Sequence, residues 1–133
     1  MKSTFVILFL ALFTSQLGFS QTTGEATKEG SKASIEWIKL EHDLGEIPQN
    51  KPITVKFSFK NAGLVPVIIT NVESSCGCTV PDYPRSPIKY GQTAEISATY
   101  DAKNLGAFFK TIKVFTNAGG KAEELKLKGI VIK

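Results

Sequence analysis

The chain has 133 residues, a formal net charge of +4 at pH 7, and only two cysteines and one histidine. That length corresponds to about one domain, and so small a surplus of charge without a lysine and arginine cluster argues against nucleic acid as a partner. A catalytic triad needs a histidine and a structural zinc site usually needs four cysteine or histidine ligands, so one histidine and two cysteines make both kinds of site difficult to build.

The N-terminal segment has the three parts of a secretory signal peptide. Lys2 gives a positive start, residues 5–13 form an unbroken apolar run, and the small residues Gly18 and Ser20 precede Gln21. This run is far shorter than the roughly 20 residues that a membrane-spanning helix needs. We therefore expect cleavage near Ser20-Gln21, a periplasmic or secreted location, and no transmembrane helix in the mature form.

Removal of the expected signal peptide, residues 1–20, lowers the net charge to +3, since Lys2 is the only charged residue lost. Residues 21–32 contain no large apolar side chain and are rich in Thr, Gly, Glu and Lys, which is typical of a flexible leader. The sequence thus predicts one folded domain over residues 33–133.

Short apolar runs and turn residues alternate from Ala33 onward. Residues 35–40 and 43–48 predict short strands, the second stopped by proline. Residues 53–60 alternate strictly between apolar and polar side chains, so a strand with one buried face is expected there.

The second half continues this pattern. The β-branched residues 65–72 predict a strand covered on both faces near its middle, and prolines at spacing three predict an extended surface course over residues 80–88. Further strands are expected over residues 94–100, 108–116 and 125–132, each preceded by a turn. About seven short strands without helical periodicity predict an all-β, two-sheet antiparallel sandwich, with a small barrel as the alternative.

The two cysteines stand one residue apart, as Cys76-Gly77-Cys78. In an oxidising compartment such a pair is bridged, metal-bound, buried or reactive. The simplest interpretation is two small buried side chains, or one ring that ties down a loop. A reducible thiol-exchange switch lacks an activating neighbour, and a Cu(I) site with His42 as third ligand would need a partner chain to close it.

Conventional catalysis finds no support in the sequence. A triad would have to use His42, which stands between Glu41 and Asp43 and is expected to be a solvated strand-end residue. Gly119-Gly120 lacks the lysine and the helix of a phosphate loop, so no cofactor is predicted. Tyr83, Arg85 and Tyr90 are candidate partner contacts near loops, whereas Trp37 is expected in the core.

The order of several segments carries a resemblance. They are Asp43-Leu44-Gly45-Glu46-Ile47, Lys60-Asn61-Ala62-Gly63, Val72 through Pro81 with Cys-Gly-Cys-Thr at its centre, and Leu125 through Val131. This order resembles the bacterial domain-of-unknown-function family 1573, common in exported Bacteroidetes proteins. The family often has Pro-Gly where this chain has Tyr90-Gly91.

The resemblance implies an immunoglobulin-like β-sandwich, similar to sperm-protein and cilium-associated modules that act mainly as interaction domains. It implies no established activity. We therefore expect an exported, non-enzymatic module that binds an unknown protein or cell-envelope component, with residues 76–87 as its recognition surface. The alternative is an extracytoplasmic thiol redox or copper-handling protein that uses Cys76 and Cys78.

Overall fold

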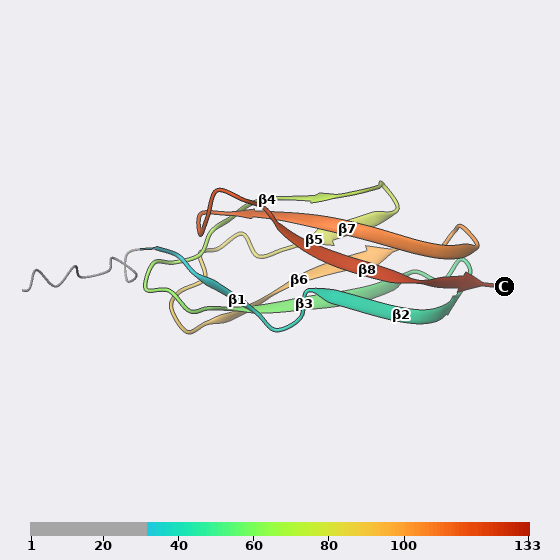
Figure 1. The fold of residues 1–133 in the computed structure, drawn as a ribbon, viewed down its shortest axis with the longest axis horizontal. Helices are drawn as coiled ribbons and strands as arrows, with labels where there is room; N and C mark the ends of the chain where they lie inside the picture. The colour runs from blue at the N-terminus through green and yellow to red at the C-terminus, as the bar shows by residue number, and fades with distance from the viewer. Residues whose placement is uncertain (1–31) are drawn as a thin grey trace, which may run out of the picture.

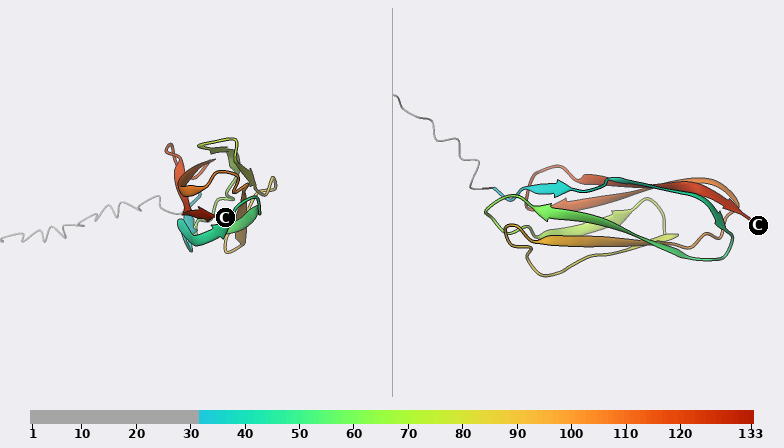
Figure 2. Two further views of the ribbon diagram at one scale, coloured as in Figure 1. Left: turned by 90° about the vertical axis from the view of Figure 1, so that its right-hand side faces the viewer. Right: turned by 90° about the horizontal axis from the view of Figure 1, so that it is seen from below.

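The computed structural model describes residues 32–133, which form two four-stranded sheets and no helix. The strands are β1 (Ile35–Trp37), β2 (Glu41–Pro48), β3 (Ile53–Asn61), β4 (Ile69–Ser74), β5 (Thr79–Asp82), β6 (Thr93–Tyr100), β7 (Gly106–Thr116) and β8 (Glu123–Ile132). One sheet has the order β1-β3-β6-β5 and the other β2-β8-β7-β4. The strands run along the long axis of the molecule, and the two sheets lie face to face across it (Figure 1, Figure 2).

This arrangement confirms the expected all-β sandwich, with eight strands rather than about seven. The expected signal peptide and residues 21–31 of the expected leader lie outside the described residues. Within residues 32–133, no helix is long and apolar enough to cross a membrane.

Two segments differ from the sequence-based expectation. Residues 79–82 pair with β6 as a strand, although only an extended surface course is predicted for them. Conversely, β4 begins only at Ile69, and Ile68 is 42% exposed, so the prediction of a strand covered on both faces over residues 65–72 is wrong. The cause is local: Pro66 has no N–H to pair, and the Asn117 side chain bonds the carbonyl of Pro66 and the N–H of Ile68 instead.

One strand pair is parallel, unlike the others. β2 runs parallel to β8, with a bulge between Asp43 and Glu46 where Gly45 takes a φ of 61°. The two strands come from opposite ends of the folded segment, so no hairpin fixes their relative direction. Glycine suits this bulge because it adopts a positive φ without steric cost.

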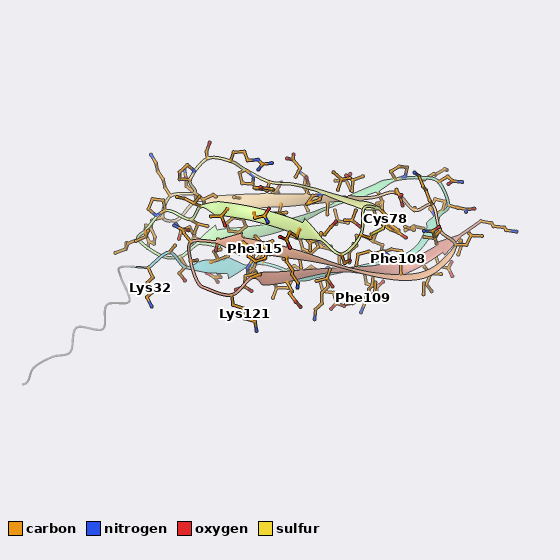
Figure 3. All side chains as sticks on the ribbon, turned by 90° about the horizontal axis from the view of Figure 1, so that it is seen from above. Lys32, Cys78, Phe108, Phe109, Phe115 and Lys121 are labelled. Carbon is orange, nitrogen blue, oxygen red and sulfur yellow. A yellow bond between two sulfur atoms is a disulfide. The ribbon has the colours of Figure 1, made fainter. Side chains whose placement is uncertain are left out.

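The core consists of the inward faces of both sheets. On β7, Phe108, Ile112 and Val114 are buried, whereas Phe109 is 57% exposed on the outer face (Figure 3). Three further strands supply most of the other fully buried large apolar side chains, which are Phe57, Phe59, Ile96, Tyr100, Leu125 and Leu127. The two-residue alternation of these strands thus predicts their buried faces correctly.

Gly129 makes room for an aromatic stack in this core. A Cβ at Gly129 would lie 2.8 Å from the Phe108 ring, and that ring stacks on Tyr100 with centroids 4.3 Å apart. Trp37 packs against the edge of the core, 5.0 Å from the Phe59 ring, as expected.

Candidate functional site

A groove of about 680 Å³ lies between β6 and the segment that follows β5. Tyr83, Pro84 and Pro87 line one side of the groove. Thr93, Glu95 and Ser97 of β6 line the other side, and Lys56 of β3 also contributes. The groove therefore coincides with part of the segment that the sequence indicates as a recognition surface.

The strand register explains why the groove exists. β6 pairs with β3 from Thr93 to Tyr100, but with β5 only from Ser97 to Tyr100. After Asp82 the chain leaves the sheet, because Pro84 has no N–H with which to continue the ladder. The first half of β6 consequently has a strand neighbour on one side only.

Tyr83 lines the groove, and Arg85, which is not itself a lining residue, packs on the Tyr83 ring. Tyr83 is half-buried and packs against the core. The Arg85 guanidinium lies over the Tyr83 ring, 3.8 Å from its centroid, and donates a hydrogen bond to the Tyr83 hydroxyl. A cation over an aromatic face is favourable, so these side chains hold each other in place.

Charged and polar groups line the opposite part of the groove. Lys56 Nζ lies 3.0 Å from Glu95 Oε2, and both side chains are about half-exposed. Asp82 Oδ1 accepts a hydrogen bond from the Tyr83 N–H (3.0 Å). No ion pair forms at Asp82 within residues 32–133, so one carboxylate of the lining is left to meet a cation.

Asn61, which is fully buried at the end of β3, braces the far end of the groove. Its Nδ2 donates to the carbonyls of Val65 (2.9 Å) and Ile88 (2.8 Å), and its Oδ1 accepts from the Gly63 N–H (2.9 Å). The sequence predicts a turn over residues 61–63 and no buried role for the Asn61 side chain. The available signal is the Lys60-Asn61-Ala62-Gly63 segment itself.

The Cys76–Cys78 disulfide lies where the chain crosses from one sheet to the other. The two Cα atoms are 5.3 Å apart, and both side chains are half-buried (Figure 3). The Cys78 carbonyl accepts a hydrogen bond from the Asp101 N–H (3.0 Å), and the Ser75 N–H donates to the Thr111 carbonyl (2.8 Å). The ring closed by this disulfide ends directly before β5, and the chain that follows β5 forms one wall of the groove.

His42 and Tyr90 lie elsewhere. His42 is the second residue of β2, so its expected place at a strand end is confirmed. Its side chain is half-buried rather than solvated, because Nε2 donates to the Lys56 carbonyl (2.9 Å) and the ring meets Phe57 edge-on. In the described part of the chain, no three His, Cys, Asp or Glu side chains gather to hold a metal, so His42 is not grouped with the cysteines. Tyr90 is 62% exposed on the turn before β6 and does not line the groove.

Displaced pKa values mark two other places in the molecule. A hydrogen bond from Lys128 lowers the pKa of Glu41, and the same bond raises the pKa of Lys128. Burial raises the pKa of Tyr100, with Asp101 adding to the effect. The ion pair lies on the β2–β8 ladder, and Tyr100 belongs to the core. Neither supplies an acid–base pair to the groove.

A family model described as "Protein of unknown function (DUF1573)" matches residues 35–131, which is most of the chain. The chain belongs to this DUF1573 family. A comparison of the DUF1573 chain with curated proteins gives no match.

Solved structures with the same fold come from several sources. A protein of unknown function from Porphyromonas gingivalis W83 superposes with a TM-score of 0.67 at 16% identity, covering 79% of this chain and 50% of that one. The ASH/PapD-like domain 7 of human CEP192 gives 0.62 at 10% identity, covering 79% of this chain and 88% of that one. The secreted serine protease VesC from Vibrio cholerae gives 0.58 at 11% identity, covering 78% of this chain and 24% of that one.

These similarities establish the immunoglobulin-like fold of the DUF1573 domain. The chain spans about half the length of the Porphyromonas gingivalis protein that it matches. At such identities the likeness shows the fold alone, because one fold hosts many functions.

Proposed function

We propose that this DUF1573 domain is an exported, non-enzymatic interaction module of the periplasm or cell exterior. It recognises a protein or cell-envelope component through the groove between β6 and residues 82–88. The observation that carries the proposal is the groove itself, lined by a preformed aromatic side chain and by opposed charges.

Tyr83 in the groove wall and the adjacent Arg85 support recognition. Tyrosine and arginine are enriched among residues that dominate binding energy, and here each fixes the other's position. The buried amide of Asn61 and the mutual backbone bonds of Val67 and Ile88 (2.8 Å each) hold the loop in shape. A partner would thus meet a surface that needs little ordering on binding.

The groove offers hydroxyl groups, and within the described residues none of them is hydrogen-bonded to the carboxylates of Asp82 or Glu95. Ser86, Ser97 and Thr93 line the groove, whereas the single histidine of the chain, His42 on β2, donates to the Lys56 carbonyl of β3. Nucleophilic catalysis by a hydroxyl needs an adjacent base, so the arrangement favours binding over turnover.

The proposal is tested by affinity capture from the native cell envelope with the mature domain as bait. We expect Arg85→Ala, and Tyr83→Phe together with Arg85→Ala, to reduce capture of the principal partner at least fivefold. These substitutions remove the cation and the hydroxyl while they keep the ring that packs on the core.

The matched control is Lys89→Ala with Tyr90→Ala, which removes a cation and an aromatic side chain from an exposed turn outside the groove. We expect this variant to capture the partner as the native domain does. Equal capture by the groove variants and the native domain would remove the groove from consideration.

The second candidate is thiol redox or copper chemistry, and it is favoured only by the half-buried Cys76–Cys78 bond. In the redox form, a dithiol protein attacks one sulfur to give a mixed disulfide, and its second thiol then releases the reduced pair. Two electrons and two protons pass to Cys76 and Cys78, and the donor becomes a disulfide.

Mass spectrometry of the untreated mature protein, with a titration against dithiol buffers and a copper assay, separates this candidate from the first. The redox and copper candidate is eliminated if the disulfide stays intact at the redox potentials of the compartment and the protein contains no copper. Reversible reduction within that range, or stoichiometric Cu(I), would instead support it.

A further inference from the structure

We propose that the groove binds an extended peptide segment of a partner protein, which pairs as an added strand with the free edge of β6 at Thr93 and Glu95. The inference rests on the proposed function and specifies its mode of recognition. Strand addition to an exposed sheet edge supplies affinity through main-chain hydrogen bonds and specificity through alternate side chains.

The hydrogen-bond alternation of β6 shows which residues face the groove. Asp101 donates its N–H to the carbonyl of Cys78, and these two residues are opposite each other in the extended β5–β6 register. Bonded pairs alternate along an antiparallel ladder, so Thr99, Ser97, Glu95 and Thr93 all direct their N–H and C=O groups to the β5 side.

The β3 side gives the complementary result. Asn61 donates its N–H to the carbonyl of Gln92, which stands opposite it in the β3–β6 register. By the same alternation, Ala94 and Ile96 direct their backbone groups to β3. The two ladders therefore agree that Thr93 and Glu95 point toward the groove.

β5 does not reach these two residues. Its pairing with β6 ends at Asp82 and Ser97, and in the described chain no backbone hydrogen bond joins residues 83–88 to Thr93 or Glu95. The residue that would stand opposite Glu95 is Pro84, which has no N–H. Two donors and two acceptors of β6 thus border a groove with room for another chain.

Other edges of the sandwich are less suited to pairing. The outer edge of β5 carries Pro81, and β1 has only three residues. In the second sheet, β2 combines a bulge with Pro48, and β4 has an irregular register between Ile69 and Asn71. Proline, bulges and short length are the devices that block edge pairing in natural sheets. The free part of β6, residues 93–96, carries neither a proline nor a bulge.

The side chains define the chemistry of the added segment. The peptide residue opposite Glu95 would project on the outer face, one pleat repeat from Asp82. A lysine or arginine there would meet the unpaired carboxylate of Asp82 beside the Lys56–Glu95 ion pair. Its two neighbours would point inward toward the half-buried Ala94 and the buried Ile88, where small apolar side chains fit. We therefore expect the central three residues of the bound peptide to be apolar, cationic and apolar. The cationic residue, which pairs with Glu95, should not be replaced by proline.

The test begins with selection of random nonapeptides on the mature domain, followed by synthesis of an enriched peptide. We expect Lys or Arg between two apolar residues. N-methylation of the cationic residue's amide should weaken binding at least tenfold, because the methyl group removes the hydrogen-bond donor. N-methylation of a neighbouring amide, which points away from β6, is the matched control and should change the affinity less than threefold.

Amide hydrogen exchange provides the second readout on the same complex. Bound peptide should slow exchange at Thr93 and Glu95 at least tenfold, whereas Ala94 and Ile96, already bonded to β3, serve as internal controls. No enriched peptide, equal affinity after N-methylation at the cationic residue, or unchanged exchange at Thr93 and Glu95 would overturn strand addition.

A chain starting at residue 33 is compared with one starting at residue 21. If the shorter chain loses existing protection at Thr93 and Glu95, residues 21–32 occupy the edge and the external partner is excluded. If envelope capture still depends on Arg85 while the peptide arm fails, the groove function stands and only the pairing mode falls. If the peptides bind as expected but envelope capture ignores Arg85, the pairing mode stands and the proposed role of Arg85 is rejected.

Discussion

A single amide side chain organises much of the loop architecture around the groove. Asn61 joins three backbone positions from two separate loops, and it does so without exposure to solvent. Buried backbone groups need partners, so the loss of this side chain leaves several of them unpaired.

We expect Asn61→Ala to lower the free energy of unfolding by about 3 kcal/mol, measured by urea denaturation. The matched control is Asn71→Ala, because Asn71 is exposed and bonds only the Glu73 side chain. That change should cost less than about 0.5 kcal/mol. Similar losses in the two variants would contradict the bracing role of Asn61.

The exposed ion pair on β2 and β8 makes a pH-dependent prediction. Lys128 Nζ lies 2.6 Å from Glu41 Oε1, and this contact lowers the pKa of Glu41. A lowered carboxyl pKa contributes stability above the ordinary value of about 4.3, and the contribution is lost as the pH falls through the folded value.

We expect Lys128→Gln to move the Glu41 titration to higher pH, as measured by carbon-13 NMR of the carboxyl group. Lys56→Gln, which breaks an ion pair on the other sheet, should leave the Glu41 titration in place. A Glu41 titration that does not respond to Lys128→Gln would show that the contact is absent in solution.

At the scale of the strand, the alternation of side chains between the two faces of a sheet decides which residues are buried. Two phenylalanines on opposite kinds of face show this directly. Phe57 on β3 is fully buried, whereas Phe109 on β7 is 57% exposed. We expect Phe57→Ala to cost about 3–5 kcal/mol in chemical denaturation, as large core truncations do. Phe109→Ala should cost less than about 1 kcal/mol. Equal costs would mean that the faces of these strands are misassigned.

Strands with strict alternation were the predictable elements, and β3 and β6 follow their patterns closely. β5 was harder to predict from the sequence, because it is stabilised mainly by pairing with β6, which begins about ten residues further along the chain. The late start of β4 depends on Asn117, about fifty residues away. The parallel β2–β8 pair likewise joins distant segments. Local patterns do not report such partners.

The groove was predictable in part for the same reason. Pro84, Pro87 and Tyr83 mark its wall in the sequence, and Arg85 lies next to them in the chain. Lys56, Glu95 and the free edge of β6 become part of it only through strand register. One signal was available: Pro84, without an N–H, must interrupt any pairing that continues beyond Asp82.

At the scale of the whole molecule, the expected domain boundary at residue 33 remains a prediction. Ala33 is 5% exposed, and β1 packs Ile35 and Trp37 against the core. We expect chains starting at residues 21 and 33 to unfold with free energies within about 0.5 kcal/mol of each other. A chain starting at residue 40 should lose about 2–4 kcal/mol, because two large side chains no longer bury apolar surface.

Denaturant unfolding of the three chains, with equal slopes as the check on two-state behaviour, decides the boundary. A loss above about 1 kcal/mol on removal of residues 21–32 would place part of the leader within the fold.

The parallel pairing of β2 with β8 has a mechanical consequence. Lys32 and Lys133 lie at opposite ends of the long axis (Figure 1), so tension between them pulls the start of β2 and the end of β8 in opposite directions. Short β1 would detach first, and the load would then fall along the β2–β8 ladder in shear, on all of its hydrogen bonds together. A sandwich whose terminal strands are parallel and loaded in shear resists stretching far better than one whose terminal strands separate one hydrogen bond at a time.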